Sequence, residues 1–172
     1  ASGKRTPVAA AKPKTPPKPK PQPAAAKPDT AWEPQIVVFA CNWCSYAGAD
    51  TAGVSRIQHQ PNFRMIRVMC SGRVSPMFIL EALRGGADGV LVTGCHIGDC
   101  HYIAGNERAI DNIEMARSLI ELLGIEPQRL RLEWISAAEG TRFAEVVTEF
   151  TEQVRRWRAP VATSPRTVEP AA

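Results

Sequence analysis

Five cysteines carry the most informative chemistry in this sequence: Cys41, Cys44, Cys70, Cys95 and Cys100. Cys41 and Cys44 are separated by two residues, a spacing at which two thiolates can bind one metal ion. Two further thiolates from the other three cysteines would complete the four ligands of a [2Fe-2S] cluster, a [4Fe-4S] cluster or a structural zinc ion. The pattern therefore predicts a metal or cluster site with one cysteine to spare.

Three of the segments that lead into these cysteines have the composition of buried strands. IVVFAC ends at Cys41, FRMIRVMC ends at Cys70 and GVLVTGC ends at Cys95. In an open parallel sheet, the carboxyl ends of the strands form one edge, and ligands bind in the crevice at that edge. We therefore expect all five cysteines to meet there, although they are far apart in the chain.

Four rounds of strand and helix are expected after the first 31 residues. The expected strands are Gln35–Ala40, Phe63–Met69, Gly89–Thr93 and Leu130–Ile135. The expected helices are Ser45–Ile57, Pro76–Arg84, Glu107–Leu123 and a last one whose apolar residues recur at helical spacing from Phe143 to Trp157. This alternation predicts right-handed crossovers and an α/β fold: a small three-layer domain with a parallel sheet of four strands, flavodoxin-like or Rossmann-like.

Composition divides the chain into three parts. Residues 1–31 form a basic Pro/Ala/Lys-rich tail that we expect to be disordered, residues 32–158 form the α/β domain, and residues 159–172 form a flexible C-terminal tail. Seven of the 21 Lys and Arg residues lie among residues 1–28, which hold no acid, so the remaining chain has a net charge of −3. The tail lacks interleaved aromatic residues, so we expect no nucleic-acid partner. No apolar run approaches the ~18 residues of a membrane span.

Other uses of the thiols remain open. A four-thiolate zinc site has the same ligands as a cluster, and a CxxC pair can serve a thiol-disulfide oxidoreductase. Zinc sites usually take ligands from two short hairpins, whereas these cysteines follow three separate strands, which favours a cluster. Stable disulfides are not expected, because the odd number of cysteines and the α/β pattern without a signal sequence indicate a reducing, cytoplasmic compartment.

Several polar and aromatic residues border the cysteines. His96 and His101 each follow a cysteine directly, but they lack the Cys-x-His spacing of mixed His/Cys clusters, so we expect hydrogen bonding or loop packing instead. Trp43 is expected to shield the site from water or to pack in the core. Glu139, after the fourth strand, is expected to be a docking or loop residue rather than an acid catalyst.

Three stretches resemble a known family: FACNWCSYAGADTAGVSRIQ, RMIRVMCSGRVSPMFILEALRGGADGVLVTGCHIGDCHYIAGN and LRLEWISAAEG. They are similar to the delta, iron-sulfur subunit of the methyl-viologen-reducing (F420-non-reducing) [NiFe] hydrogenases, over roughly residues 35 to 157. The resemblance implies a small [2Fe-2S] protein that passes electrons from a hydrogenase or formate dehydrogenase module to the flavin-containing A subunit of heterodisulfide reductase. It also implies that all five cysteines belong to the cofactor site.

We therefore expect a non-catalytic electron-transfer subunit of an oxidoreductase complex. The expected ligands are Cys41, Cys44, Cys95 and Cys100, with Cys70 nearby as the alternative ligand. The expected cofactor is a [2Fe-2S] cluster, with a [4Fe-4S] cluster or zinc as the alternatives. Zinc would make the chain a metal-stabilised interaction module instead.

Overall fold

The computed structural model describes residues 32–157, so the predicted tails at 1–31 and 159–172 lie outside the described residues. Within the described part, four parallel strands form one sheet in the order β2-β1-β3-β4. The strands are β1 (Ile36–Cys41), β2 (Phe63–Val68), β3 (Gly89–Gly94) and β4 (Leu130–Trp134). The central strands β1 and β3 are almost continuously apolar because both of their faces are covered.

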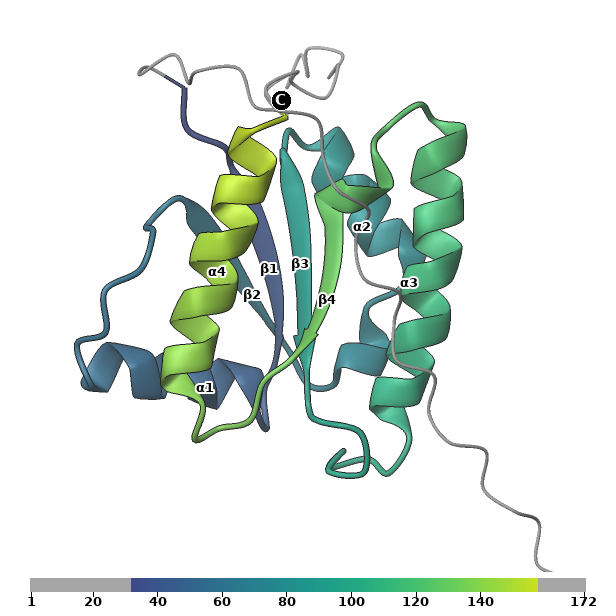
Figure 1. The fold of residues 1–172 in the computed structure, drawn as a ribbon. Helices are drawn as coiled ribbons and strands as arrows, with labels where there is room; N and C mark the ends of the chain where they lie inside the picture. The colour runs from purple at the N-terminus through teal and green to yellow at the C-terminus, as the bar shows by residue number, and fades with distance from the viewer. Residues whose placement is uncertain (1–31, 158–172) are drawn as a thin grey trace, which may run out of the picture.

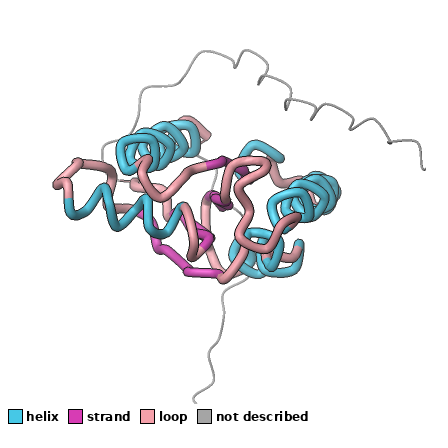
Figure 2. The backbone as a smooth tube through the Cα atoms, turned by 90° about the horizontal axis from the view of Figure 1, so that it is seen from below, coloured by secondary structure: helices cyan, strands magenta, loops and turns pink. Residues whose placement is uncertain are grey.

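Helices cover both faces of the sheet (Figures 1 and 2). They are α1 (Ser45–Val54), α2 (Pro76–Arg84), α3 (Gly105–Leu122) and α4 (Gly140–Arg155). One buried cluster joins α1 and α4 to the sheet and includes Phe143 and Phe150, whereas the other joins α2 and α3 and includes Ile79 and Ile113. The predicted fold class, a three-layer α/β domain with a four-stranded parallel sheet, is confirmed.

Most of the predicted element boundaries hold within two residues, and the differences have local causes. α1 ends at Val54 rather than Ile57, because Arg56 adopts a left-handed φ of 54° and turns the chain. α3 begins at Gly105, two residues before the predicted start, which brings its first turn directly against the cysteine loops. Ser75 occupies the predicted N-cap of α2, but its side chain makes no capping hydrogen bond.

The carboxyl ends of all four strands lie at one edge, which faces down in Figure 1 and toward the viewer in Figure 2. Two loops and two short helical segments shape this edge: the β1–α1 turn, the β3–α3 loop, η1 (Ser71–Arg73) after β2, and the first turn of α3. At the opposite edge, Arg155 Nη2 donates to Glu33 Oε2 at 2.7 Å, which ties the end of α4 to the segment before β1. None of the helices in residues 32–157 combines the length and the apolar character that crossing a membrane requires.

Candidate metal centre

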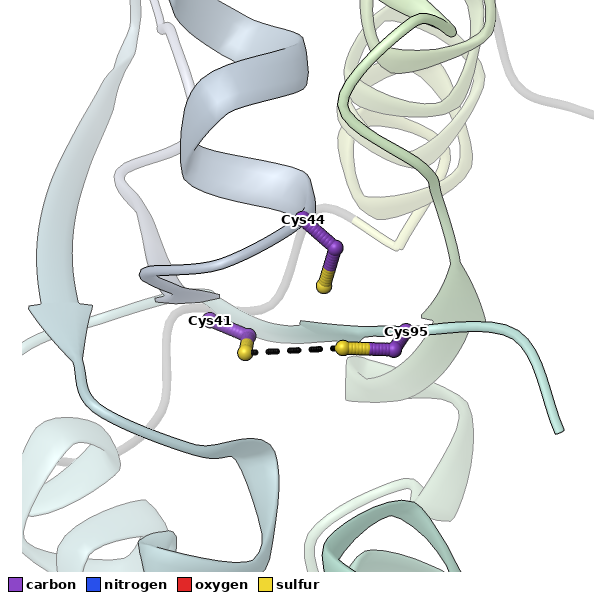
Figure 3. Close-up of side chains that lie close together, drawn as sticks. All are labelled: Cys41, Cys44 and Cys95. Carbon is purple, nitrogen blue, oxygen red and sulfur yellow. Dashed lines mark hydrogen bonds between the residues drawn. The ribbon is translucent and has the colours of Figure 1, made fainter. Parts of the chain in front are cut away.

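Three cysteine side chains converge in the buried part of this edge. Cys41 is the last residue of β1, Cys44 is the N-cap of α1 and Cys95 follows β3, so each comes from a different element. Their Sγ atoms all lie within 4.8 Å of one another, and the Sγ atoms of Cys41 and Cys95 are 3.8 Å apart. Figure 3 shows the three thiols pointing toward a common centre. We call this group the thiol triad.

A pair of buried hydroxyl groups fixes the turn that carries two members of the triad. The backbone N–H of Cys41 donates to Ser45 Oγ at 2.9 Å, and Thr93 Oγ1 on β3 donates to the same oxygen at 2.8 Å. Both side chains are fully buried. Because a buried hydrogen-bonded network tolerates little displacement, Ser45 and Thr93 hold the end of β1 and the start of α1 in one geometry.

The three thiols of the triad have different electrostatic environments. The Cys44 thiol lowers the pKa of Cys41 to about 5 by hydrogen bonding, against the opposing effect of burial, and the backbone N–H of Trp43 adds to the lowering. The same hydrogen bond, together with burial, raises the pKa of Cys44, and burial raises the pKa of Cys95. A negative charge is thus already accommodated at Cys41, as thiolate ligation of a metal requires.

Cys70 and Cys100 form a second group beside the triad, which we call the thiol pair. Cys70 follows β2 and Cys100 lies in the β3–α3 loop, and the two meet at Gly105, the first residue of α3. A Cβ atom on Gly105 would overlap Cys70 Sγ and would lie 3.1 Å from Cys100 Sγ. The Gly105 N–H donates to Cys100 Sγ at 3.2 Å. Only glycine leaves room for both sulfur atoms at the start of this helix.

The two members of the pair have opposite electrostatic environments. Burial raises the pKa of Cys70, and the proximity of Cys100 and Cys41 adds to this. At Cys100 burial acts in the same direction, but backbone N–H groups of Tyr102, Asn106 and Gly105 outweigh it and lower the pKa of the thiol. Cys100 therefore has the better environment for a thiolate within the pair.

An aromatic layer covers part of the site. The rings of Trp43 and His101 stack with centroids 3.8 Å apart and an interplanar angle of 17°. Trp43 Nε1 donates to the hydroxyl of Tyr102 at 3.2 Å. Trp43 is 46% exposed, so it lies over the site at the surface rather than in the core. His101 is therefore used in packing, as expected.

A cavity of about 270 Å³ adjoins two of the triad thiols. Its lining includes Cys44 and Cys95 together with His96 and Asp99. His96 Nε2 lies 2.7 Å from Glu139 Oε2, and the same carboxylate oxygen accepts a hydrogen bond from the Ser136 N–H at 2.6 Å. The Ser136 N–H and His96 lower the pKa of Glu139 to about 2. Glu139 thus contacts His96 in the lining of this cavity, which fits the expected loop role.

The donor set fits a thiolate-bound metal centre. Three buried sulfur donors already lie within 4.8 Å of one another, and two further thiols lie together at Gly105 at the start of α3. All five cysteines are free. Four thiolates are the number that an iron-sulfur cluster or a structural zinc ion takes, so the residues present can supply a full ligand set. The ligand set Cys41, Cys44, Cys95 and Cys100, with Cys70 as the alternative, remains a prediction.

Comparison with known proteins identifies the family. A family model described as "Methyl-viologen-reducing hydrogenase, delta subunit" matches residues 36–157. These residues include all the strands and helices described above and all five cysteines. The chain belongs to this family. The resemblance read from the cysteine motifs is thereby confirmed.

Relatives of this chain include small proteins and a larger one. An iron-sulfur subunit of the F420-non-reducing hydrogenase of Archaeoglobus profundus is 56% identical over 125 residues, which cover 73% of this chain and 91% of the relative. The iron-sulfur subunit of the F420-non-reducing hydrogenase vhc of Methanococcus voltae is 52% identical, over 72% of this chain and 86% of the relative. The A subunit of the ferredoxin:CoB-CoM heterodisulfide reductase of Methanosarcina mazei is 54% identical over 70% of this chain, but the match covers only 15% of that protein.

Sequence reasoning assigned no role to four residues that support the site. They are Ser45, Thr93, Gly105 and Asn106. Ser45 directly follows Cys44, and the Gly-Asn step ends the cysteine loop, so both could have been suspected from their position. The sequence gives no indication that Thr93 supports the site, because threonine is common in strands.

Proposed function

We propose that this chain is an electron-transfer subunit that binds a [2Fe-2S] cluster through Cys41, Cys44, Cys95 and Cys100, with Cys70 as the alternative ligand. The observation that carries the proposal is the buried thiol triad in a chain whose relatives are iron-sulfur subunits. When bound, such a cluster accepts and releases one electron at a time. The protein residues bury the sulfur atoms, keep water away from them and supply N–H groups to the thiolates.

The proposed partners are a hydrogenase or formate dehydrogenase module on one side and a heterodisulfide-reductase-A-type flavoprotein on the other. The relative from Methanosarcina mazei supports the second partner, because there a closely similar segment is part of the A subunit of a heterodisulfide reductase. We propose that the assembly works in the reducing cytoplasm, where cysteine ligands stay reduced.

The first test is the metal content of protein purified without oxygen. We expect about two irons and two acid-labile sulfides per chain, and a spin-half EPR signal after reduction with dithionite. About four irons and four sulfides would instead indicate a [4Fe-4S] cluster. Zinc without iron or an EPR signal would contradict electron transfer and indicate a zinc-stabilised interaction module. Thiol-disulfide exchange by metal-free protein would indicate an oxidoreductase that uses Cys41 and Cys44.

Exposed apolar side chains around the cysteines support a protein-protein contact at this edge. Six of them lie within three positions of a cysteine, with exposed fractions from 36% to 88%, and we call them the apolar rim: Trp43, Tyr46, Met69, Ile97, Tyr102 and Ile103. Ile103 is 88% exposed and has a φ of 73°, which is unfavourable for a β-branched residue. A strained, solvent-exposed isoleucine beside the site fits a residue that becomes buried against a partner.

Ile103→Asp tests this contact. Asp tolerates a left-handed φ better than Ile, so we expect the variant to fold and to keep its metal. We expect its binding to a heterodisulfide-reductase-A-type flavoprotein to weaken by about tenfold or more, as measured by biolayer interferometry. Leu122→Asp is the matched control, since Leu122 is 83% exposed at the far end of α3. Equal losses for both variants, or none for Ile103→Asp, would exclude the rim as the docking surface.

A further inference from the structure

Asn106, the second residue of α3, is a buried polar side chain with no role in metal ligation. It is 1% exposed. Its Nδ2 donates to the carbonyl oxygen of His96 at 2.8 Å and to that of Cys95 at 3.3 Å, and its Oδ1 accepts from the Glu107 N–H at 3.0 Å. Both ends of the amide are therefore satisfied by backbone groups, which makes the position specific for asparagine.

These contacts close the loop that carries Cys100. The loop leaves β3 at Cys95 and reaches α3 at Gly105. Asn106, the next residue of α3, donates to the carbonyl groups of the first two residues of the loop, Cys95 and His96. On its other side, the start of α3 contacts Cys100 directly, because the N–H of Gly105 donates to Cys100 Sγ. The first two residues of α3 thus contact both groups of thiols. The Asn106 side chain binds the backbone of Cys95 in the thiol triad, and the Gly105 N–H binds Cys100 in the thiol pair.

We propose that Asn106 is a positioning residue that fixes Cys100 relative to Cys95, so that the thiol pair stays within reach of the triad. Its effect on a bound cluster rests on the proposed function. Its effect on the two cysteines does not, because the hydrogen bonds are made by the polypeptide alone. Without the side-chain amide, two backbone carbonyl groups lose this donor, and the start of the loop is no longer tied to α3 by a side chain.

α3 offers a matched control two turns further along. Asn112 Nδ2 also donates to two backbone carbonyls, those of Val74 at 3.1 Å and Gly72 at 3.4 Å. These carbonyls belong to the segment that follows Cys70. Asn112→Ala therefore removes the same kind of contact from the same helix, but releases the other cysteine segment.

The test on the metal-loaded chain compares Asn106→Ala, Asn106→Asp and Asn112→Ala. Asp keeps the size and the acceptor of Asn but loses the donor, so both Asn106 variants should behave alike. We expect each to lose iron to a chelator about tenfold faster than the parent and to show shifted EPR g-values, as changes to groups around metal ligands do. Asn112→Ala should keep the parent g-values. The inference would be overturned if the Asn106 variants kept the parent rate of iron loss and the parent g-values, or if Asn112→Ala shifted the g-values equally.

A second measurement does not depend on the metal. In metal-free full-length protein, we expect Asn106→Ala to raise the alkylation rate of Cys100 by iodoacetamide about tenfold, since the loop opens more often. Peptide mass spectrometry reports each cysteine separately, and the rate at Cys41 should stay within about twofold of the parent. Equal alkylation rates of Cys100 in parent and variant would overturn the inference even if the chain binds a cluster. If the parent binds no iron, the proposed function fails while this measurement still decides the role of Asn106.

Discussion

Replacing Cys41, Cys44 or Cys95 by serine is expected to reduce the bound iron to below about a tenth of the parent value. Each of these variants removes one of three buried sulfur donors that lie within 4.8 Å of one another. A serine hydroxyl is not deprotonated near neutral pH and is a poor ligand for iron. Cys70 and Cys100 lie together at Gly105, outside the group of three close sulfur atoms, so we do not expect the spare cysteine to replace a triad thiol. Iron and sulfide analysis of each variant, purified without oxygen, measures the effect.

The thiol pair provides the contrast to this series. If Cys100 is the fourth ligand, Cys100→Ser should lose iron as the triad variants do, whereas Cys70→Ser should keep most of it. The opposite result, with iron lost only from Cys70→Ser, would overturn the proposed ligand set. Retention in both single variants, with loss in the double variant, would show that the two cysteines can replace each other, which their common contact with Gly105 makes sterically reasonable.

Gly72→Ala is expected to destabilise the fold by about 2 to 3 kcal/mol and to lower the iron content together with stability. A Cβ atom on Gly72 would lie 2.5 Å from the carbonyl oxygen of Gly105 and 3.1 Å from its Cα atom. Both are backbone atoms, so no side chain can rotate away, and η1 must move away from α3. That movement separates Cys70 from Cys100, because the two thiols meet at Gly105. Urea unfolding of the metal-free protein measures the loss of stability, and iron analysis measures the effect on the site.

Gly53→Ala is the control for this variant. Gly53 lies in α1, and a Cβ atom there meets no atom within 4 Å. We expect this change to stabilise the protein by about 0.5 to 1 kcal/mol, because alanine loses less conformational entropy in a helix than glycine. A loss of stability in Gly53→Ala similar to that in Gly72→Ala would mean that close backbone packing at Gly72 is not the cause.

The fold followed from the sequence because its signals are local and consistent. The apolar run before Cys41 and the one that ends at Gly94 are bounded by small or polar residues, and each is followed by a helical pattern. The first-turn proline of α2, Pro76, marked a helix start that the structure reproduces. Parallel strands then place the residue after each strand at the same edge, whatever the separation in sequence.

The arrangement of the site was less accessible from sequence. Strand ends predicted one group of five thiols, whereas the structure has a buried triad and a pair at Gly105. That division depends on the start of α3 at Gly105 and on the path of the β3–α3 loop, whose first two residues accept hydrogen bonds from the Asn106 side chain. Such contacts join residues ten or more positions apart and leave no periodic pattern to read.

The end of α4 and the segment before β1 meet at the edge of the sheet opposite to the cysteines, where Arg155 pairs with Glu33. Both ends of residues 32–157 therefore lie on the side of the domain away from the thiols. A domain with both ends on that side can form a separate chain or one segment of a longer chain, and the joining segments then attach at the edge opposite to the cysteines. Both arrangements occur among the relatives: the matching segment makes up most of the small hydrogenase subunits but only a small part of the heterodisulfide reductase subunit.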